Sequence, residues 1–428
     1  MRTEPPKRSW TAVEFAILAA LPERGRDLAR LRVLVDQTPP PTVTVIGKYN
    51  HGKSRLLNEL IGSPVFSVAD RRETVTLADH DGDGACWLDS PGLDADVGRD
   101  DDHLAEQAAW IRSDIRLFVH AAREGELDAD ERRLLDALRD DARDTRRRTL
   151  LVLTQIDQLP DDATLAEVID AIGAQAPGWE PYPVSSSRHR QGVDGGKRLL
   201  LERSGMPRLR AALADALADV PQARRHEAGR LLAGLQAELR RNLSASEQAR
   251  SALRQQQAAQ RQAFDRDLDD VLTKVGGELR VVVDVPGPDI ALEPDSFENL
   301  FRITPAKLER ARLQVAYSRA CIAINAVLTG HGVVGLPAAQ RTRVASLDTV
   351  IVAVLGVSVK FRDDLRRLFC EPAGRQGLAA AFARYFEQSD DRRALAQRIA
   401  DHDAAIAVAD QALSAVQALI ARTERRDD

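Results

Sequence analysis

The chain has 428 residues, of which 44% are hydrophobic and 4% aromatic, and this length predicts two folded parts rather than one core. The 60 basic and 65 acidic residues give a net charge of −5 and are spread over both halves. This balance excludes the strongly basic body that is expected of a protein that binds duplex nucleic acid.

Neither the start of the chain nor its cysteines indicate export. The first ten residues, MRTEPPKRSW, lack the apolar segment of a secretory signal. Cys86, Cys321 and Cys370 are odd in number and widely spaced, so they predict neither a disulfide framework nor a metal-ligand pair. We therefore expect a cytoplasmic protein whose cysteines are small buried side chains.

The first predicted element is a helix over residues 9–36. It carries a broad apolar stripe, and Pro22 and Gly25 are expected to break it. Residues 39–41 are all proline and punctuate the chain. The next segment, TVTVIG at 42–47, alternates and is β-branched, which predicts a buried strand.

From there to about residue 220, predicted strands alternate with predicted helices. The strands are expected at 42–46, 75–79, 85–89, 115–120, 149–154 and 181–184. The sequence DGDG at 81–84 is a hairpin signal and predicts one antiparallel edge strand. The pattern as a whole predicts an α/β fold, in which a mostly parallel sheet has helices on both faces.

Beyond residue 220 helical periodicity replaces the strand pattern, chiefly over 222–280 and 378–424. In the last helix, apolar residues recur at every seventh position, with others at companion positions. The first set is Ile399, Ile406, Leu413 and Ile420, and the second is Leu395, Ala409 and Val416. Such a seam predicts packing against other helices, and an antiparallel bundle within one chain is favoured over an intermolecular coiled coil. We expect an all-α bundle or stalk over residues 221–428.

A phosphate-binding loop is predicted by GKYNHGKS, which runs from Gly47 to Ser54 and matches G-x-x-x-x-G-K-[ST]. Its backbone N–H groups and the start of the following helix supply the donors that phosphates need. Lys53 is expected to reach the β- and γ-phosphates as a catalytic residue, and Ser54 to ligate Mg²⁺. The other residues expected to line the nucleotide here are Gly47, Asn50, His51, Gly52 and Arg55. For His51, exposure to solvent is an equally good interpretation.

Two further segments are expected to meet the metal and the γ-phosphate. DSPG follows the apolar strand ACWLD, so that Asp89 is placed to hold Mg²⁺ and the N–H of Gly92 to sense the γ-phosphate. Between the loop and DSPG, Thr74 or Thr76 is expected to close over the metal as a catalytic residue and ligand. Thr74 is favoured, and an ordinary threonine at a strand edge is the alternative.

Selection of the base is predicted at the ends of two later strands. TQID contains Thr154, Gln155 and Asp157, and its carboxylate can face the N1–H and N2–H₂ donors that guanine has and adenine lacks. VSSS follows the last strand, and Ser185 or Ser186 can aim a backbone N–H at the guanine O6. Both segments lie where an open α/β sheet binds its ligands.

In this order the motifs resemble the translation-factor-like branch of P-loop GTPases, particularly the Era-like and dynamin-like proteins, with a bacterial dynamin-like protein favoured. The resemblance rests on GKYNHGKSRLLNELIG, a switch threonine, DSPGL, GELDADERRLLDAL, TQID and VSSS, and covers residues 42–220. It implies that the chain binds GTP and GDP and hydrolyses GTP with Mg²⁺.

Three residues carry further implications of this resemblance. Asn50 matches the loop asparagine that helps some Era-like proteins bind a catalytic K⁺ ion. Leu93 stands where Ras-like enzymes have a glutamine that orients water, which implies slow turnover without a cation or a partner. Gln155 replaces the lysine that is usual in [NT]-K-x-D, and this departure bears on nucleotide affinity.

In dynamin-like proteins a helix before the GTPase domain packs with the far C-terminal helix as a neck, and residues 1–40 and 392–424 are suited to this. Two apolar runs, 320–340 and 349–359, fit either a hairpin tip that touches a membrane or buried helices joined by a glycine-rich turn, and the buried helices are favoured. We expect a homodimer or oligomer through the GTPase or helical part as one option, and peripheral contact with the inner face of the cell membrane as another.

Two rival functions remain. An Era-like protein that acts on RNA or ribosomes requires a basic, β-containing module after residue 220, which the helical pattern does not predict, so nucleic acid is not an expected partner. The other rival is a nucleotide switch that regulates a partner protein without hydrolysis.

Overall fold

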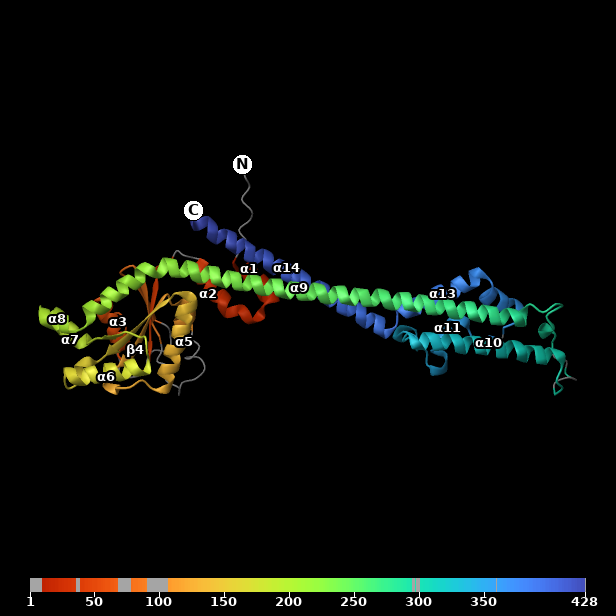
Figure 1. Cartoon of the computed structure of the whole chain (residues 1–428), viewed down its shortest axis with the longest axis horizontal. Helices are drawn as coiled ribbons and strands as arrows, with labels where there is room; N and C mark the ends of the chain where they lie inside the picture. The colour runs from red at the N-terminus through yellow and green to blue at the C-terminus, as the bar shows by residue number, and fades with distance from the viewer. Residues whose placement is uncertain are drawn as a thin grey trace, which may run out of the picture. The chain divides into compact units, whose positions relative to one another are not determined.

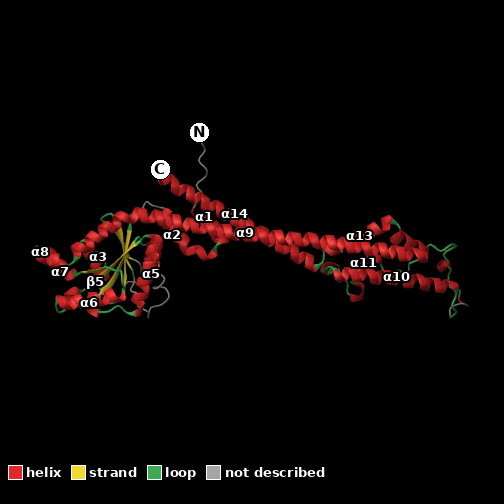
Figure 2. Cartoon of the chain, viewed as in Figure 1, coloured by secondary structure: helices red, strands yellow, loops and turns green. Residues whose placement is uncertain are grey.

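The computed structural model describes residues 10–35, 39–67, 78–90, 107–294, 297, 301–358 and 360–427, which fall into two compact units. The sheet unit comprises residues 1–241 and 408–428, and the helical unit comprises residues 242–407. Figures 1 and 2 show their elements. The division lies beyond the expected boundary at residue 220, because the long helix that starts at Met206 first packs on the sheet.

The sheet has six strands in the order β2-β3-β1-β4-β5-β6. Neighbouring strands are parallel except for the β2–β3 hairpin, whose turn residues Asp83 and Gly84 both have positive φ, as this tight turn requires. The predicted α/β fold and its antiparallel edge strand are therefore confirmed. The strands are β1 Thr42–Gly47, β2 Ala78–Gly82, β3 Ala85–Asp89, β4 Ile115–Ala121, β5 Arg148–Thr154 and β6 Pro181–Pro183.

Helices cover both faces of this sheet (Figure 2). Val43 and Val45 of β1 pack with α3 and the start of α9, whereas Ile46 and Phe118 face α5 and α6, because successive strand residues point to opposite faces. The central strand β1 lies between β3 and β4, so the loop after it opens at the point where chain connections diverge. The helices named here and those after β6 are α3 Lys53–Ile61, α5 Ala129–Thr145, α6 Asp162–Gln175, α7 Ser186–Asp194, α8 Arg198–Arg203 and α9 Met206–Val283.

The first helical segment is broken where the sequence predicts. α1 (Trp10–Ala20) ends before the short turn at Pro22–Arg24, and α2 (Gly25–Val35) follows. Both helices bury apolar side chains in one cluster with residues 228–239 of α9 and 412–419 of α14 (Asp390–Asp427). Segments from the beginning, middle and end of the chain thus share one core in the sheet unit.

A buried ion network joins these helices to the base of the sheet. Asp114, which directly precedes β4, accepts hydrogen bonds from the Thr42 backbone N–H at 2.8 Å, from Arg30 of α2 at 3.2 Å and from Arg224 of α9 at 3.0 Å. Glu227 of α9 accepts from Arg30 at 2.8 Å. All four charged side chains are at most 6% exposed.

The helical unit has a core of its own around Phe264, which stacks on Phe386 with ring centroids 4.2 Å apart. The apolar runs at 320–340 and 349–359 contribute Ile324, Leu328 and Val350 to this core. These side chains are buried, as the favoured interpretation of the runs as buried helices predicts. One helix, Asp390–Glu424 within α14, is long and apolar enough to cross a membrane, a weak signal that core helices share. The remaining helices are α10 Pro305–Gly330, α11 Val350–Leu355, α12 Arg362–Leu365 and α13 Pro372–Glu387.

Candidate nucleotide-binding site

The predicted phosphate loop connects β1 to α3, and its glycines stand where side chains do not fit. A Cβ on Gly47 would lie 2.3 Å from the Val119 carbonyl oxygen. Gly52 caps α3 with a left-handed φ of 81°. The exposed Asn50 is also left-handed, with φ of 59°. Glycine at positions 47 and 52 therefore allows the chain to turn tightly into α3.

Lys53 is folded back over the loop rather than extended into solvent. Its side chain is buried, and its Nζ donates hydrogen bonds to the carbonyl oxygens of Gly47 at 2.9 Å and Lys48 at 2.8 Å. The ammonium thus lies inside the curve of the loop, where the motif predicts a phosphate-binding cation. The neighbouring Arg55 points away from the core and is exposed.

Ser54 and Asp89 form a pair suited to a hard cation. The Ser54 hydroxyl donates to Asp89 Oδ2 at 2.6 Å, and Asp89 Oδ1 is buried with no hydrogen-bond partner among the described residues. Burial raises the pKa of the Asp89 carboxyl, against the opposing effects of Ser54 and Lys53. An oxygen-only pair with one uncompensated carboxylate oxygen fits Mg²⁺, so the predicted ligands are adjacent.

Two residues of TQID brace the loop. The Thr154 hydroxyl donates to the His51 carbonyl oxygen at 2.5 Å, and Gln155 Nε2 donates to the Asn50 carbonyl oxygen at 2.7 Å. Gln155 itself adopts a left-handed φ of 60°. The Gln155 amide is therefore directed at the loop.

Asp157 lies in the short helical turn Ile156–Gln158 and is positioned by the start of α7. Its Oδ1 accepts a hydrogen bond from the Ser185 hydroxyl at 2.6 Å, while Ser185 also caps α7 by accepting from the Arg188 N–H. The Ser185 N–H donates to the Ser204 carbonyl. Ser186, whose N–H lies in the first turn of α7 without an intrahelical acceptor, is the better candidate donor to a base carbonyl.

His51 neither faces a phosphate site with its side chain nor lies in solvent. It is 1% exposed, its Nδ1 lies 3.2 Å from the Val119 carbonyl oxygen, and its Nε2 lies 3.0 Å from Glu124 Oε2. The interpretation that His51 is exposed to solvent was wrong, because a loop motif specifies the backbone path and not the direction of this side chain, and its place among the residues that line the nucleotide stays a prediction. Its backbone remains part of the loop.

The sequence reasoning missed the contacts that hold the loop from the side of α5. Lys48 forms an ion pair with Asp128, which raises the pKa of the Lys48 ammonium and leaves it charged. Asp128 and Glu131 form a reciprocal capping box at the start of α5. The spacing D-x-x-E at 128–131 is a signal that could have identified this box. The predicted Thr74, its alternative Thr76, Gly92 and Leu93 lie outside the described residues.

The first part of the chain is similar in sequence to known GTPases. The sequence profile of the family described as 50S ribosome-binding GTPase matches residues 42–155. GTPase Era of Bordetella petrii is 29% identical over 155 residues, which are 35% of this chain and 51% of the relative. The chain thus spans about half the length of that relative. A crystal structure of Era with MgGDPNP and a 16S ribosomal RNA fragment has a TM-score of 0.30 and 25% identity, covering 37% of this chain and 55% of the Era chain.

Another relative matches nearly the whole chain. An uncharacterized protein of Acinetobacter baylyi is 53% identical over 383 residues, which cover 90% of this chain and 91% of the relative. The two therefore share the helical unit as well as the sheet unit. The chain belongs to the same family as the Acinetobacter baylyi protein, and residues 42–155 form a P-loop GTPase domain with Era among its distant relatives.

Proposed function

We propose that the sheet unit binds GTP with Mg²⁺ and hydrolyses it slowly to GDP, with Lys53 and Ser54 at the phosphates and Asp157 at the base. The observation that carries this proposal is the Ser54–Asp89 pair, in which a 2.6 Å hydrogen bond leaves one buried carboxylate oxygen beside a serine hydroxyl. This pair follows directly on the loop that holds the Lys53 ammonium.

Different residues of the site bind the phosphates and recognise the base. Lys53 exchanges its contacts with the Gly47 and Lys48 carbonyls for phosphate oxygens, which gain a charge-assisted hydrogen bond. Mg²⁺, when bound, neutralises charge on the β- and γ-phosphates. Asp157, oriented by Ser185, accepts from the guanine donors. Because Leu93 has no polar atom to orient water, we expect slow turnover. If Asn50 helps to bind a catalytic K⁺ ion, GTP turnover should be faster in K⁺ than in Na⁺.

Lys53→Ala and Ser54→Ala test the phosphate end, with Arg198→Ala as the control because Arg198 of α8 is 90% exposed and lies outside the predicted site. Loss of one charged hydrogen-bond donor is worth about 1.5–3 kcal/mol, so GTP affinity in Lys53→Ala should fall by about 10- to 150-fold. Fluorescent GTP titration and phosphate release measure the two effects. Full GTP turnover in both Lys53→Ala and Ser54→Ala would exclude this site.

We further propose that the helical unit couples the nucleotide state to assembly or to peripheral contact of a cytoplasmic protein with the inner face of the cell membrane. The observation that favours a membrane contact lies between α9 and α10, where Phe297, Phe301 and Ile303 are 92%, 96% and 80% exposed. Large apolar side chains with this exposure are typical of surfaces that meet another apolar phase. α9 and α14 each contribute residues to both units, which supplies covalent continuity for the coupling.

Flotation with vesicles of phosphatidylcholine and phosphatidylglycerol tests this second proposal. Phe301→Asp should reduce the floated fraction, whereas Phe15→Asp, which changes an equally apolar side chain that is 75% exposed on α1, should not. Equal flotation of both variants and the unchanged chain, or no flotation in GDP and in GTP, would contradict the membrane contact.

An Era-like role on RNA is the alternative, and the sequence relationship with GTPase Era supports it at least as well as the dynamin-like role. The expectation that nucleic acid is not a partner therefore stays a prediction without support from the comparisons. Gel-shift titration with ribosomal RNA in the GTP and GDP states distinguishes the two roles, because only the Era-like role predicts saturable binding.

A further inference from the structure

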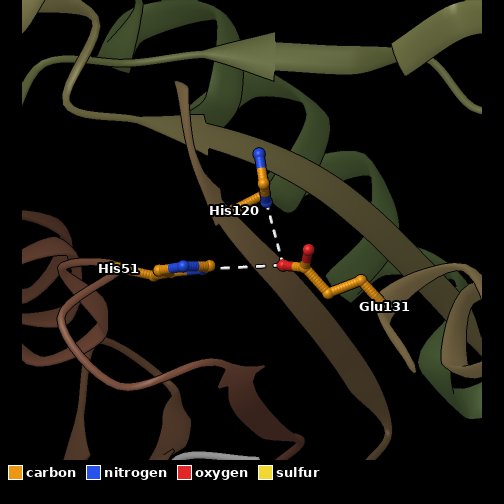
Figure 3. A group of neighbouring side chains, drawn as sticks. All are labelled: His51, His120 and Glu131. Carbon is orange, nitrogen blue, oxygen red and sulfur yellow. Dashed lines mark hydrogen bonds and ion pairs between the residues drawn. The ribbon is translucent and has the colours of Figure 1, made fainter. Parts of the chain in front are cut away.

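Directly behind the phosphate loop, two histidines and a glutamate from three separate elements converge (Figure 3). His51 comes from the loop, His120 from β4 and Glu131 from the first turn of α5. Their side chains are 1%, 0% and 3% exposed. No step of the proposed hydrolysis uses these side chains.

The potential ligand atoms lie close together. His120 Nδ1 lies 2.8 Å and His51 Nδ1 3.7 Å from the same atom, Glu131 Oε1, and the ligand atoms of the cluster all lie within 4.8 Å of one another. Zinc–ligand bonds of about 2.0–2.1 Å in a tetrahedron place neighbouring ligand atoms about 3.3 Å apart. The distances from Glu131 Oε1 to His120 Nδ1, 2.8 Å, and to His51 Nδ1, 3.7 Å, lie below and above that value.

All four ring nitrogens of the two histidines face oxygen atoms: His120 Nδ1 faces Glu131, and the oxygen nearest to His51 Nδ1 is the Val119 carbonyl oxygen, at 3.2 Å. The far nitrogens also face acceptors, since His51 Nε2 lies 3.0 Å from the Glu124 carboxylate and His120 Nε2 lies 3.3 Å from the Gly125 carbonyl oxygen. A neutral imidazole has only one N–H, so two neutral rings leave two lone pairs facing oxygen atoms. A metal bound at both Nδ1 atoms lets each Nε2–H donate to its oxygen, and it requires His51 Nδ1 to leave the Val119 carbonyl oxygen for the metal.

The surroundings also match those of a metal centre. A histidine that binds a metal usually donates its other N–H to a carboxylate or a carbonyl, which here are Glu124 and Gly125. Glu131 Oε2 accepts from the Asp128 N–H at 3.1 Å, which directs Oε1 at the cluster.

We propose that His51, His120 and Glu131 bind one divalent transition metal of the Zn²⁺ class. Two imidazole nitrogens and one carboxylate oxygen favour such a metal over Mg²⁺, which prefers an all-oxygen set such as Ser54 and Asp89. The metal ties the middle of the phosphate loop to β4 and α5. Its occupancy therefore controls how firmly the loop is held before a nucleotide binds.

The test uses the full chain without a polyhistidine tag, loaded with Zn²⁺ and dialysed. Elemental analysis should find one Zn²⁺ per chain, which falls to background in His120→Gln and Glu131→Gln and is retained in His226→Gln, where a half-buried histidine of α9 outside the cluster is changed. Glu124→Gln should weaken Zn²⁺ binding by about 10- to 100-fold in a chelator competition, because it removes only the orienting carboxylate.

A second measurement does not depend on the variants folding. Addition of Co²⁺ to the metal-free unchanged chain should give a visible d–d absorption that Zn²⁺ abolishes and Mg²⁺ does not, and Zn²⁺ should raise Tm in the absence of nucleotide. If the unchanged chain retains no Zn²⁺ and shows no cobalt spectrum, the cluster is held by hydrogen bonds alone and the proposal is overturned. These readouts need no GTP, so their failure is separate from failure of the proposed GTPase site.

Discussion

Asp114→Asn tests whether the buried ion network holds the helices to the base of the sheet. The carboxylate accepts from Thr42, Arg30 and Arg224 with both of its oxygens, and an asparagine replaces one acceptor with an N–H₂ that faces arginine donors. Removing one partner of a buried ion pair costs about 3–5 kcal/mol. At about 2–4 °C per kcal/mol for a unit of this size, we expect Tm to fall by about 6–20 °C.

Differential scanning calorimetry and urea unfolding measure this loss, and Asp79→Asn is the matched control. Asp79 also bonds an arginine, Arg112, at 2.8 Å, but the two side chains are 53% and 37% exposed, so its loss should cost about 1 kcal/mol or less. Comparable losses of stability in the two variants would refute the argument that burial makes the Asp114 network costly to break.

The contribution of Asp114 to stability should depend on pH. Burial alone would raise the pKa of Asp114, but the hydrogen bond from Arg224 and the charges of Arg30 and Arg224 lower it below its usual value. The lowered pKa contributes stability above the unfolded-state pKa of about 3.9, which is lost as pH falls through the folded-state pKa. The difference between the unchanged chain and Asp114→Asn should thus be full at pH 7 and narrow below about pH 4.

Three other substitutions test separate parts of the molecule. Gly47→Ala should lower GTP affinity at least about tenfold in a nucleotide titration, because its Cβ meets Val119 at 2.3 Å, whereas Gly62→Ala, with open space around it, should not. Asp157→Asn should lower GTP affinity by about 10- to 100-fold and improve binding of xanthosine triphosphate, whose C2 carbonyl accepts from an amide; unchanged preference in competition would exclude Asp157 from base selection. Phe264→Ala should destabilise the helical unit by about 3–5 kcal/mol in urea unfolding, since the ring is fully buried against Phe386, and a loss below about 1 kcal/mol would contradict that packing.

Elements with a local signal were predictable from the sequence. The alternation of 42–47 predicts β1, DGDG predicts the β2–β3 hairpin, and Pro22 with Gly25 predicts the break between α1 and α2. Periodicity and turn chemistry act over a few residues, so one chain is enough to detect them. The same holds for the pairing of Ser54 with Asp89, because two motifs that each follow a parallel strand end at the same edge of the sheet.

Side-chain direction was not predictable in the same way. His51 lies far from His120 and Glu131 in the sequence, and the three side chains meet only when β4 and α5 pack behind the loop. No local pattern distinguishes a histidine that faces a phosphate from one that faces the core. The exposed apolar side chains near Phe301 were missed for a related reason, because their exposure depends on where the helices of the unit end.

The position of Gln155 bears on how this loop is prepared for its ligand. The lysine usual in this motif is replaced by a residue whose short amide reaches the Asn50 carbonyl, while Thr154 holds the next carbonyl, that of His51. Lys48 is tied to Asp128 on the other side. A loop held by side chains at successive residues needs less ordering when a nucleotide binds, and preorganisation of this kind increases affinity. We therefore expect the interaction with the loop to offset the affinity lost with the lysine, so that Gln155→Ala weakens GTP binding, whereas Gln155→Lys leaves GTP affinity no higher than that of the unchanged chain.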